Sequence, residues 1–164
     1  MWKRVIGVYQ QKGLDFFDIV QEALLRHLNA ESKSAGFFAI PAEVFNPLRN
    51  QYESSMIIRR IAQEKSAEYT YAAGIVDVDI YTHGMNFIFG MADPIRKTAL
   101  VSIHRLIGDR LNERVTKEIV HEVGHLMGLG HCRKPHCVMY FSNTLIDTDN
   151  KDPDLCIECR REIE

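Results

Sequence analysis

Two histidines and a glutamate near residue 121 have the spacing of a metal site. His121 and His125 stand four residues apart in the segment 114–127, whose apolar periodicity predicts a helix. Side chains four apart lie on one helix face, so both imidazoles can reach the same ion, and neutral imidazole suits zinc. Glu122 flanks this pair, where its carboxylate can take a proton from water whose pKa zinc lowers to about 7. The residues predict zinc-assisted attack on a peptide carbonyl, with Glu122 as general base.

Gly128 and His131 extend this pattern beyond the helix. Gly128 stands three residues after His125, where a left-handed conformation would end the helix. A turn there returns the chain and brings His131 to the metal as a third ligand. Three protein ligands with one open position are typical of a catalytic zinc. A chance match is the alternative for HExxH alone, but the complete string HExxHxxGxxH resembles the metzincin signature.

Four cysteines in the last third of the chain form two close pairs. Four residues separate Cys132 from Cys137, two separate Cys156 from Cys159, and 18 lie between the pairs. This spacing suits a tetrahedral all-thiolate zinc site. Free buried thiols or two disulfides are the alternatives. Because the segment lacks apolar periodicity, we expect it to need the folding free energy that a structural zinc contributes.

The overall composition limits the classes of function. The chain has 164 residues, 46% hydrophobic and 26% charged, with a net charge of −2. That charge, without basic and aromatic stripes, argues against nucleic-acid binding around the cysteines. A zinc-stabilised binding module without turnover is a second alternative, against which the intact Glu122 argues. No apolar run approaches the ~20 residues of a membrane span, and the start of the chain lacks a secretory apolar region. We therefore expect a cytoplasmic protein with no membrane partner.

Apolar periodicity predicts an α/β fold in a single catalytic domain. The predicted strands are 4–10, 37–40, 72–81, 86–90 and 99–105, and the predicted helices are 15–28, 54–67 and 114–127. The βαβαβ opening implies a mostly parallel twisted sheet with helices packed on it. Linkers near 82–98 are too short for parallel crossovers, so 86–90 should be an antiparallel edge strand. The segment 41–50 is predicted to be a loop, and Asn112 or Thr116 to cap the metal-binding helix.

The combined motifs are similar to those of the archaemetzincins. The residues that carry the resemblance are His121, Glu122, His125, Gly128, His131, Cys132, Cys137-Val138-Met139, Phe141-Ser142-Asn143, Lys151, Cys156 and Cys159. Leu155 departs from the family's usual phenylalanine, which should require only local repacking.

This resemblance implies a metzincin fold and zinc metallopeptidase activity on a peptide or protein substrate. Met139 would be the Met-turn residue beneath the three histidines. The substrate would lie along the antiparallel edge strand by strand addition. Residues 1–128 would form an upper sheet-and-helix subdomain. Residues 129–164 would form a small irregular lower lobe with the second zinc. A monomer is the favoured state.

Overall fold

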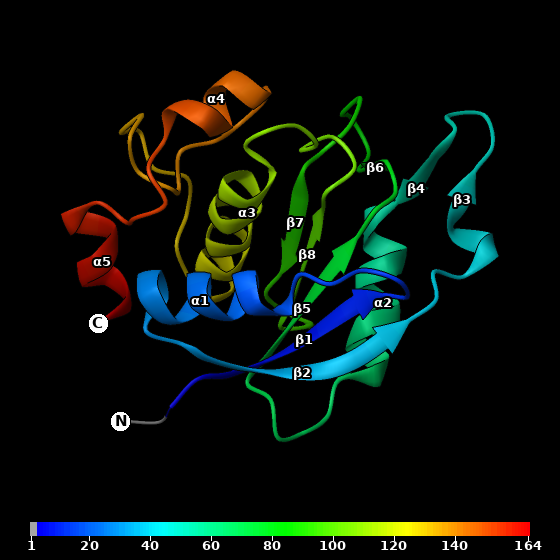
Figure 1. Cartoon of the computed structure of the whole chain (residues 1–164), viewed down its shortest axis with the longest axis horizontal. Helices are drawn as coiled ribbons and strands as arrows, with labels where there is room; N and C mark the ends of the chain where they lie inside the picture. The colour runs from blue at the N-terminus through cyan, green and yellow to red at the C-terminus, as the bar shows by residue number, and fades with distance from the viewer. Residues whose placement is uncertain (1–2) are drawn as a thin grey trace.

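A five-stranded mixed sheet forms the centre of the molecule (Figure 1). The structure, a computed structural model, describes residues 3–164. In spatial order the strands are β2 (Glu31–Phe38), β1 (Val5–Gln11), β5 (Tyr71–Val76), β8 (Thr98–Ser102) and β7 (Gly90–Asp93). The first four strands pair in parallel, whereas β7 pairs antiparallel with β8 and lies at the edge. The predicted α/β class with a mostly parallel sheet is confirmed.

Helices cover both faces of this sheet. Helices α1 (Phe17–Leu28) and α3 (Leu111–Leu126) pack on one face, and α2 (Ser54–Glu64) packs on the other. Parallel strands need crossover connections, and the helices in those crossovers bury their apolar stripes against the sheet. The stripe of α1, for example, comprises Val20, Ala23, Leu24 and Leu28. Within residues 3–164, none of the helices has the length and apolar character that crossing a bilayer requires.

The predicted loop at 41–50 contains more structure than expected. A 3-10 turn, η1 (Ala42–Val44), leads into β3 (Phe45–Asn46), which pairs with β4 (Gln51–Glu53). Strand β6 (Ile80–Tyr81) completes this small second sheet, so the strand predicted at 72–81 is in fact two. The β3–β4 hairpin projects at the upper right of Figure 1.

Two strand predictions were displaced along the chain. The edge strand predicted at 86–90 lies at Gly90–Asp93, because the preceding residues are tied to the small sheet instead. Ile88 bridges Ile80, and the side chains of Arg49 and Gln51 donate hydrogen bonds to the carbonyl of Asn86. Strand β2 begins six residues before the predicted start at 37. As the other edge strand it carries polar residues that apolar periodicity does not detect.

The start of the helix that bears His121 and His125 was also predicted wrongly. Helix α3 begins at Leu111, and neither Asn112 nor Thr116 caps it. Arg110 occupies the cap position without a side-chain hydrogen bond to the backbone. The guanidinium of Arg114 instead donates to the carbonyls of Leu106 and Ile107, which fixes the chain before the helix.

The C-terminal segment is more regular than predicted. It contains α4 (Leu145–Asn150) and α5 (Ile157–Ile163), which lie beside α3 and α1 at the left of Figure 1. A capping box between Thr144 and Asp147 starts α4, a local signal that sequence reasoning did not use. The Lys117 ammonium of α3 donates to the carbonyls of Thr148 and Asp149, which attaches α4 to α3.

Candidate metal centre

Three imidazoles converge at the C-terminal end of α3. His121 and His125 lie on one face of the helix, and the chain reverses at Gly128, whose φ is +102°. The Leu129 amide donates back to the carbonyl of Gly124, so the helix ends in a tight turn that returns His131 to the site. One ligand nitrogen from each of the three lies within 4.8 Å of the others, and the Nε2 atoms of His121 and His125 are 3.1 Å apart. The structure thus brings together the three histidines that the sequence predicted.

Backbone carbonyls orient two of these rings. The Nδ1 atom of His121 lies 2.8 Å from the carbonyl oxygen of Val138, and that of His125 lies 2.7 Å from the carbonyl oxygen of Leu129. Because a carbonyl only accepts, each Nδ1 carries the proton and each Nε2 is left with its lone pair. Burial lowers the pKa of His121 well below its ordinary value, and it lowers those of His125 and His131 as well. Neutral imidazoles with free Nε2 atoms are the form that binds zinc.

A cleft of about 580 Å³ opens beside the histidines. Its walls come from α3, from β7 and the segment before it, and from the chain on either side of His131, through Asn143. Glu122 lines this cleft and is only 6% exposed. Burial raises the pKa of Glu122 well above its ordinary value, and the nearby Glu118 carboxylate raises it further. A carboxyl group with a raised pKa is better suited to accept a proton than an ordinary glutamate.

Met139 is fully buried under α3, between the helix and the C-terminal segment. A Cβ atom at Gly124 would lie 2.6 Å from its sulfur, so the glycine between the two helix histidines makes room for the methionine. The backbone carbonyl of Met139 accepts a hydrogen bond of 2.9 Å from the amide of Cys132, next to His131. Met139 therefore packs close to the histidine-bearing part of α3.

Two residues beside the histidines were not predicted as part of the site. The Lys151 side chain has no exposed surface, and its Nζ lies 3.4 Å from Oε1 of Glu118. The same ammonium donates to the carbonyl of Tyr140 and lies 3.5 Å from Nδ1 of His121. Glu118 also lines the cleft. Its position one helical turn before Glu122 was the available sequence signal, whereas nothing local to Lys151 indicated that it is buried.

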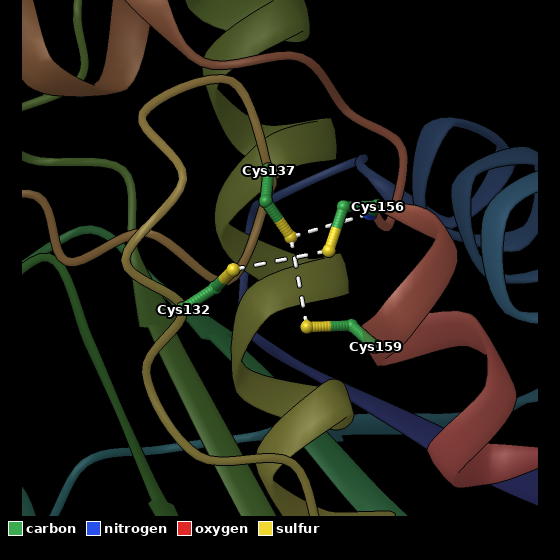
Figure 2. Close-up of side chains that lie close together, drawn as sticks. All are labelled: Cys132, Cys137, Cys156 and Cys159. Atoms are coloured by element: carbon green, nitrogen blue, oxygen red, sulfur yellow. Dashed lines mark hydrogen bonds between the residues drawn. The ribbon is translucent and has the colours of Figure 1, made fainter.

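The four cysteine sulfurs point toward a common centre (Figure 2). Cys132 and Cys137 come from the loop after α3, Cys156 stands at the start of α5, and Cys159 lies in its first turn. The sulfurs of Cys132 and Cys156 are 3.8 Å apart, and those of Cys137 and Cys159 are 3.9 Å apart. These separations are too long for disulfides, and they match the ~3.8 Å edge of a tetrahedron with zinc–sulfur bonds of about 2.3 Å.

The surroundings of the sulfurs also suit a bound cation. Backbone amides donate to two of them, from Lys134 to Cys132 and from Cys156 to Cys137, as is common around metal-bound thiolates. Burial raises the pKa of both the Cys137 and the Cys159 thiols. A cation at the centre of the cluster would oppose this effect and favour the thiolate forms. The donor set fits zinc, and the disulfide alternative is wrong.

Comparisons with known proteins agree with this geometry. Residues 47–164 match the model of peptidase family M54. An archaemetzincin from Pyrobaculum aerophilum is 45% identical over 115 residues, which cover 70% of this chain and 72% of that protein. The crystal structure of archaemetzincin from Methanopyrus kandleri superposes with a TM-score of 0.89 at 30% identity, over 98% of this chain and 93% of that one.

A crystal structure described as a zinc-dependent peptidase from Methanocorpusculum labreanum is also similar. Its TM-score is 0.87 at 27% identity, over 97% of this chain and 100% of that one. The family match covers well over half of the chain, and the structural matches cover nearly all of it. The chain therefore belongs to peptidase family M54, the archaemetzincins, and is a zinc metallopeptidase.

Proposed function

We propose that the peptidase reaction takes place at His121, His125 and His131, which bind the catalytic zinc, with Glu122 as general base. The observation that carries this proposal is the convergence of three neutral imidazoles at a cleft that the Glu122 carboxylate also lines. A zinc ion with three protein ligands supplies Lewis acidity, which lowers the pKa of water to about 7 and polarises a carbonyl.

The side chains of α3 have two further roles in this proposal, the orientation of the ligand nitrogens and the transfer of protons. The protonated Nδ1 atoms of His121 and His125 each donate to a backbone carbonyl, so both Nε2 atoms stay directed at the same point. Glu122, adjacent to His121, takes a proton from the attacking water and returns it to the leaving amine. Its buried position limits competing solvent and raises its pKa, which favours the first of these transfers, from water to the carboxylate.

The substrate is a peptide or protein segment in extended conformation. Among residues 3–164, strand β7 pairs with β8 alone, so its other edge is free, and its residues Gly90, Met91 and Ala92 line the cleft. An extended peptide can add to this free edge through main-chain hydrogen bonds, which would bring one of its carbonyls to the three histidines.

A second, structural zinc would be bound by Cys132, Cys137, Cys156 and Cys159, giving two zinc ions per chain. In this arrangement 1–128 supplies the sheet, the edge strand and the helix with its two histidines. Residues 129–164 supply His131, Met139 and the thiolate site. The two parts form one catalytic domain with the cleft between them.

Glu122→Gln tests the assignment of the base. This variant should keep both zinc ions and the fold, because Glu122 is not among the ligands. Turnover should fall by roughly two to four orders of magnitude, the usual contribution of a general base. Zinc content and cleavage rates on a peptide library are the measurements, and Glu113→Gln, on the same helix but outside the cleft, is the matched control. Full activity in the Glu122 variant would refute the assignment.

A further inference from the structure

The first residue of the edge strand, Gly90, lies directly against Glu122, the proposed base. A Cβ atom at Gly90 would lie 2.8 Å from both Cγ and Oε1 of Glu122, closer than Cβ atoms approach other atoms in real proteins. It would also lie 2.8 Å from the carbonyl oxygen of Leu100 on β8. Glycine weakens a strand, and its presence inside one often marks a close approach of another group. At Gly90 the approaching group is the carboxylate of Glu122.

Glu122 differs from the histidines in how it is oriented. His121 and His125 each have a hydrogen bond to a backbone carbonyl, whereas no group among residues 3–164 donates a hydrogen bond to the Glu122 carboxylate. The two acceptor oxygens remain available for water, so the carboxylate is positioned by packing alone. The side chain lies between α3, which bears it, and the backbone of Gly90.

The backbone at Gly90 has little freedom to move away. Gly90 is paired with Val101 on β8, and the carbonyl of Phe89 accepts a hydrogen bond of 2.9 Å from the amide of Ser102. A side chain at position 90 would be confined between the Leu100 carbonyl and Glu122. The β8 backbone is fixed by its pairing on both sides, so the contact with Leu100 would be relieved by a small shift of β7. The contact with Glu122 would be relieved if its side chain turned away.

We propose that Gly90 is a positioning residue for the reaction: its missing side chain leaves the space in which the Glu122 carboxylate faces the three histidines. This inference rests on the proposed role of Glu122 as base. It makes the edge strand part of the catalytic geometry as well as a surface for the substrate. A methyl group at position 90 should displace the base without disturbing the zinc ligands.

Gly90→Ala is the first test. We expect kcat to fall about tenfold or more, part of the ~100- to 10,000-fold that a general base supplies, with KM nearly unchanged. Zinc content should be unchanged, and so should the visible absorption spectrum of the cobalt-substituted protein, since the three atoms nearest to a Cβ at position 90 belong to Glu122 and Leu100 and not to a histidine. Gly74→Ala is the matched control. Its Cβ would contact Ile61 on the opposite face of the sheet, so it should affect stability but not kcat.

A stability cycle identifies which neighbour causes the effect and does not depend on activity. The drop in Tm caused by Gly90→Ala is measured in the wild-type and in the Glu122→Ala background. If the Glu122 side chain is the obstacle, its truncation should reduce the drop to about half or less, because contacting residues are energetically coupled. The stability measurement remains informative if Gly90→Ala alone does not fold, since the double variant Gly90→Ala, Glu122→Ala should then fold again.

The outcomes are distinguishable. An unchanged kcat in folded Gly90→Ala, or an equal Tm drop in both backgrounds, would overturn the inference and assign the clash to the Leu100 carbonyl. Those results would leave the base assignment intact if Glu122→Gln is still inactive. Full activity of Glu122→Gln would instead refute the proposed function, whatever Gly90→Ala does.

Discussion

The three-histidine site and the four-cysteine cluster differ in what orients their donor atoms. Two histidines lie on one long helix, the third is on an exposed loop, and the set borders an open cleft. The cysteines all come from the C-terminal segment, two of them buried, and their sulfurs surround a closed centre. The first arrangement leaves room for a reacting molecule, whereas the second leaves none.

The comparison also shows that the histidine site depends on the cysteine segment. The carbonyl that orients His121 belongs to Val138, the residue after Cys137. His131 directly precedes Cys132, whose amide is hydrogen-bonded to Met139. The helix positions two imidazoles in register, but the C-terminal segment orients one of them and delivers the third.

Cys156→Ser tests this dependence and should have the largest effect. We expect loss of both zinc ions and of all activity, because the loop carrying His131 and Val138 loses its anchor, while the sheet stays folded. Zinc stoichiometry and far-UV circular dichroism are the measurements. Ile157→Ser, at the exposed neighbouring position, is the control and should keep both ions. Normal cleavage with a full catalytic site in Cys156→Ser would show that the two sites are independent.

Mild chelation should separate the two sites in the unmodified protein. The histidine site has neutral ligands and an open position, so its zinc should leave first and abolish activity. The thiolate-bound zinc should remain, with the fold intact, and added zinc should restore cleavage. Simultaneous loss of both ions, or earlier loss of the thiolate-bound ion, would contradict the difference described above.

Lys151→Met tests the polar link between the helix and the C-terminal segment. Removing the ammonium leaves the buried Glu118 carboxylate without a counter-charge, with the Thr148 hydroxyl still donating to it, which should lower the free energy of unfolding by about 3–5 kcal/mol. Replacing Glu118 by Leu as well should recover most of that loss. Urea unfolding of the zinc-loaded proteins measures both. Lys117→Met is the matched comparison: its partner Glu113 is 43% exposed, so the loss should be smaller.

The smallest effect should come from Glu113, at the start of α3 and outside both metal sites. The guanidinium of Arg110, and then the ammonium of Lys117, lower the pKa of Glu113 from its ordinary 4.5 to about 2. A lowered folded-state pKa contributes stability above pH 4.5, which is lost as the pH falls toward 2. The Tm difference between wild type and Glu113→Gln should therefore shrink between pH 4.5 and pH 2. The corresponding change in the free energy of unfolding should be ~1 kcal/mol or less, because Glu113 and Arg110 are partly exposed. A difference that stays constant would contradict this.

Much of the chemistry could be predicted because its determinants are local. The i, i+4 spacing of His121 and His125 on a helix fixes their common face wherever the helix packs, and a glycine at 128 permits the turn. Buried strands and amphipathic helices likewise have periodicities that are visible in short windows. The edge strand predicted at 86–90 was displaced to β7, because the preceding residues pair with β6 and contact β4. These contacts are distant in sequence, so a short stretch of sequence does not reveal them.

The sequence by itself therefore determined the residue types and spacings of the three-histidine and four-cysteine clusters and the class of fold. Only the tertiary structure decided that Val138 orients His121, that Lys151 is buried against Glu118, and that Gly90 faces Glu122. The partners in these contacts stand 17, 33 and 32 residues apart. Local backbone geometry sets spacings within one element, whereas contacts between elements depend on how the whole chain packs its apolar surfaces, and that is decided only when the core forms.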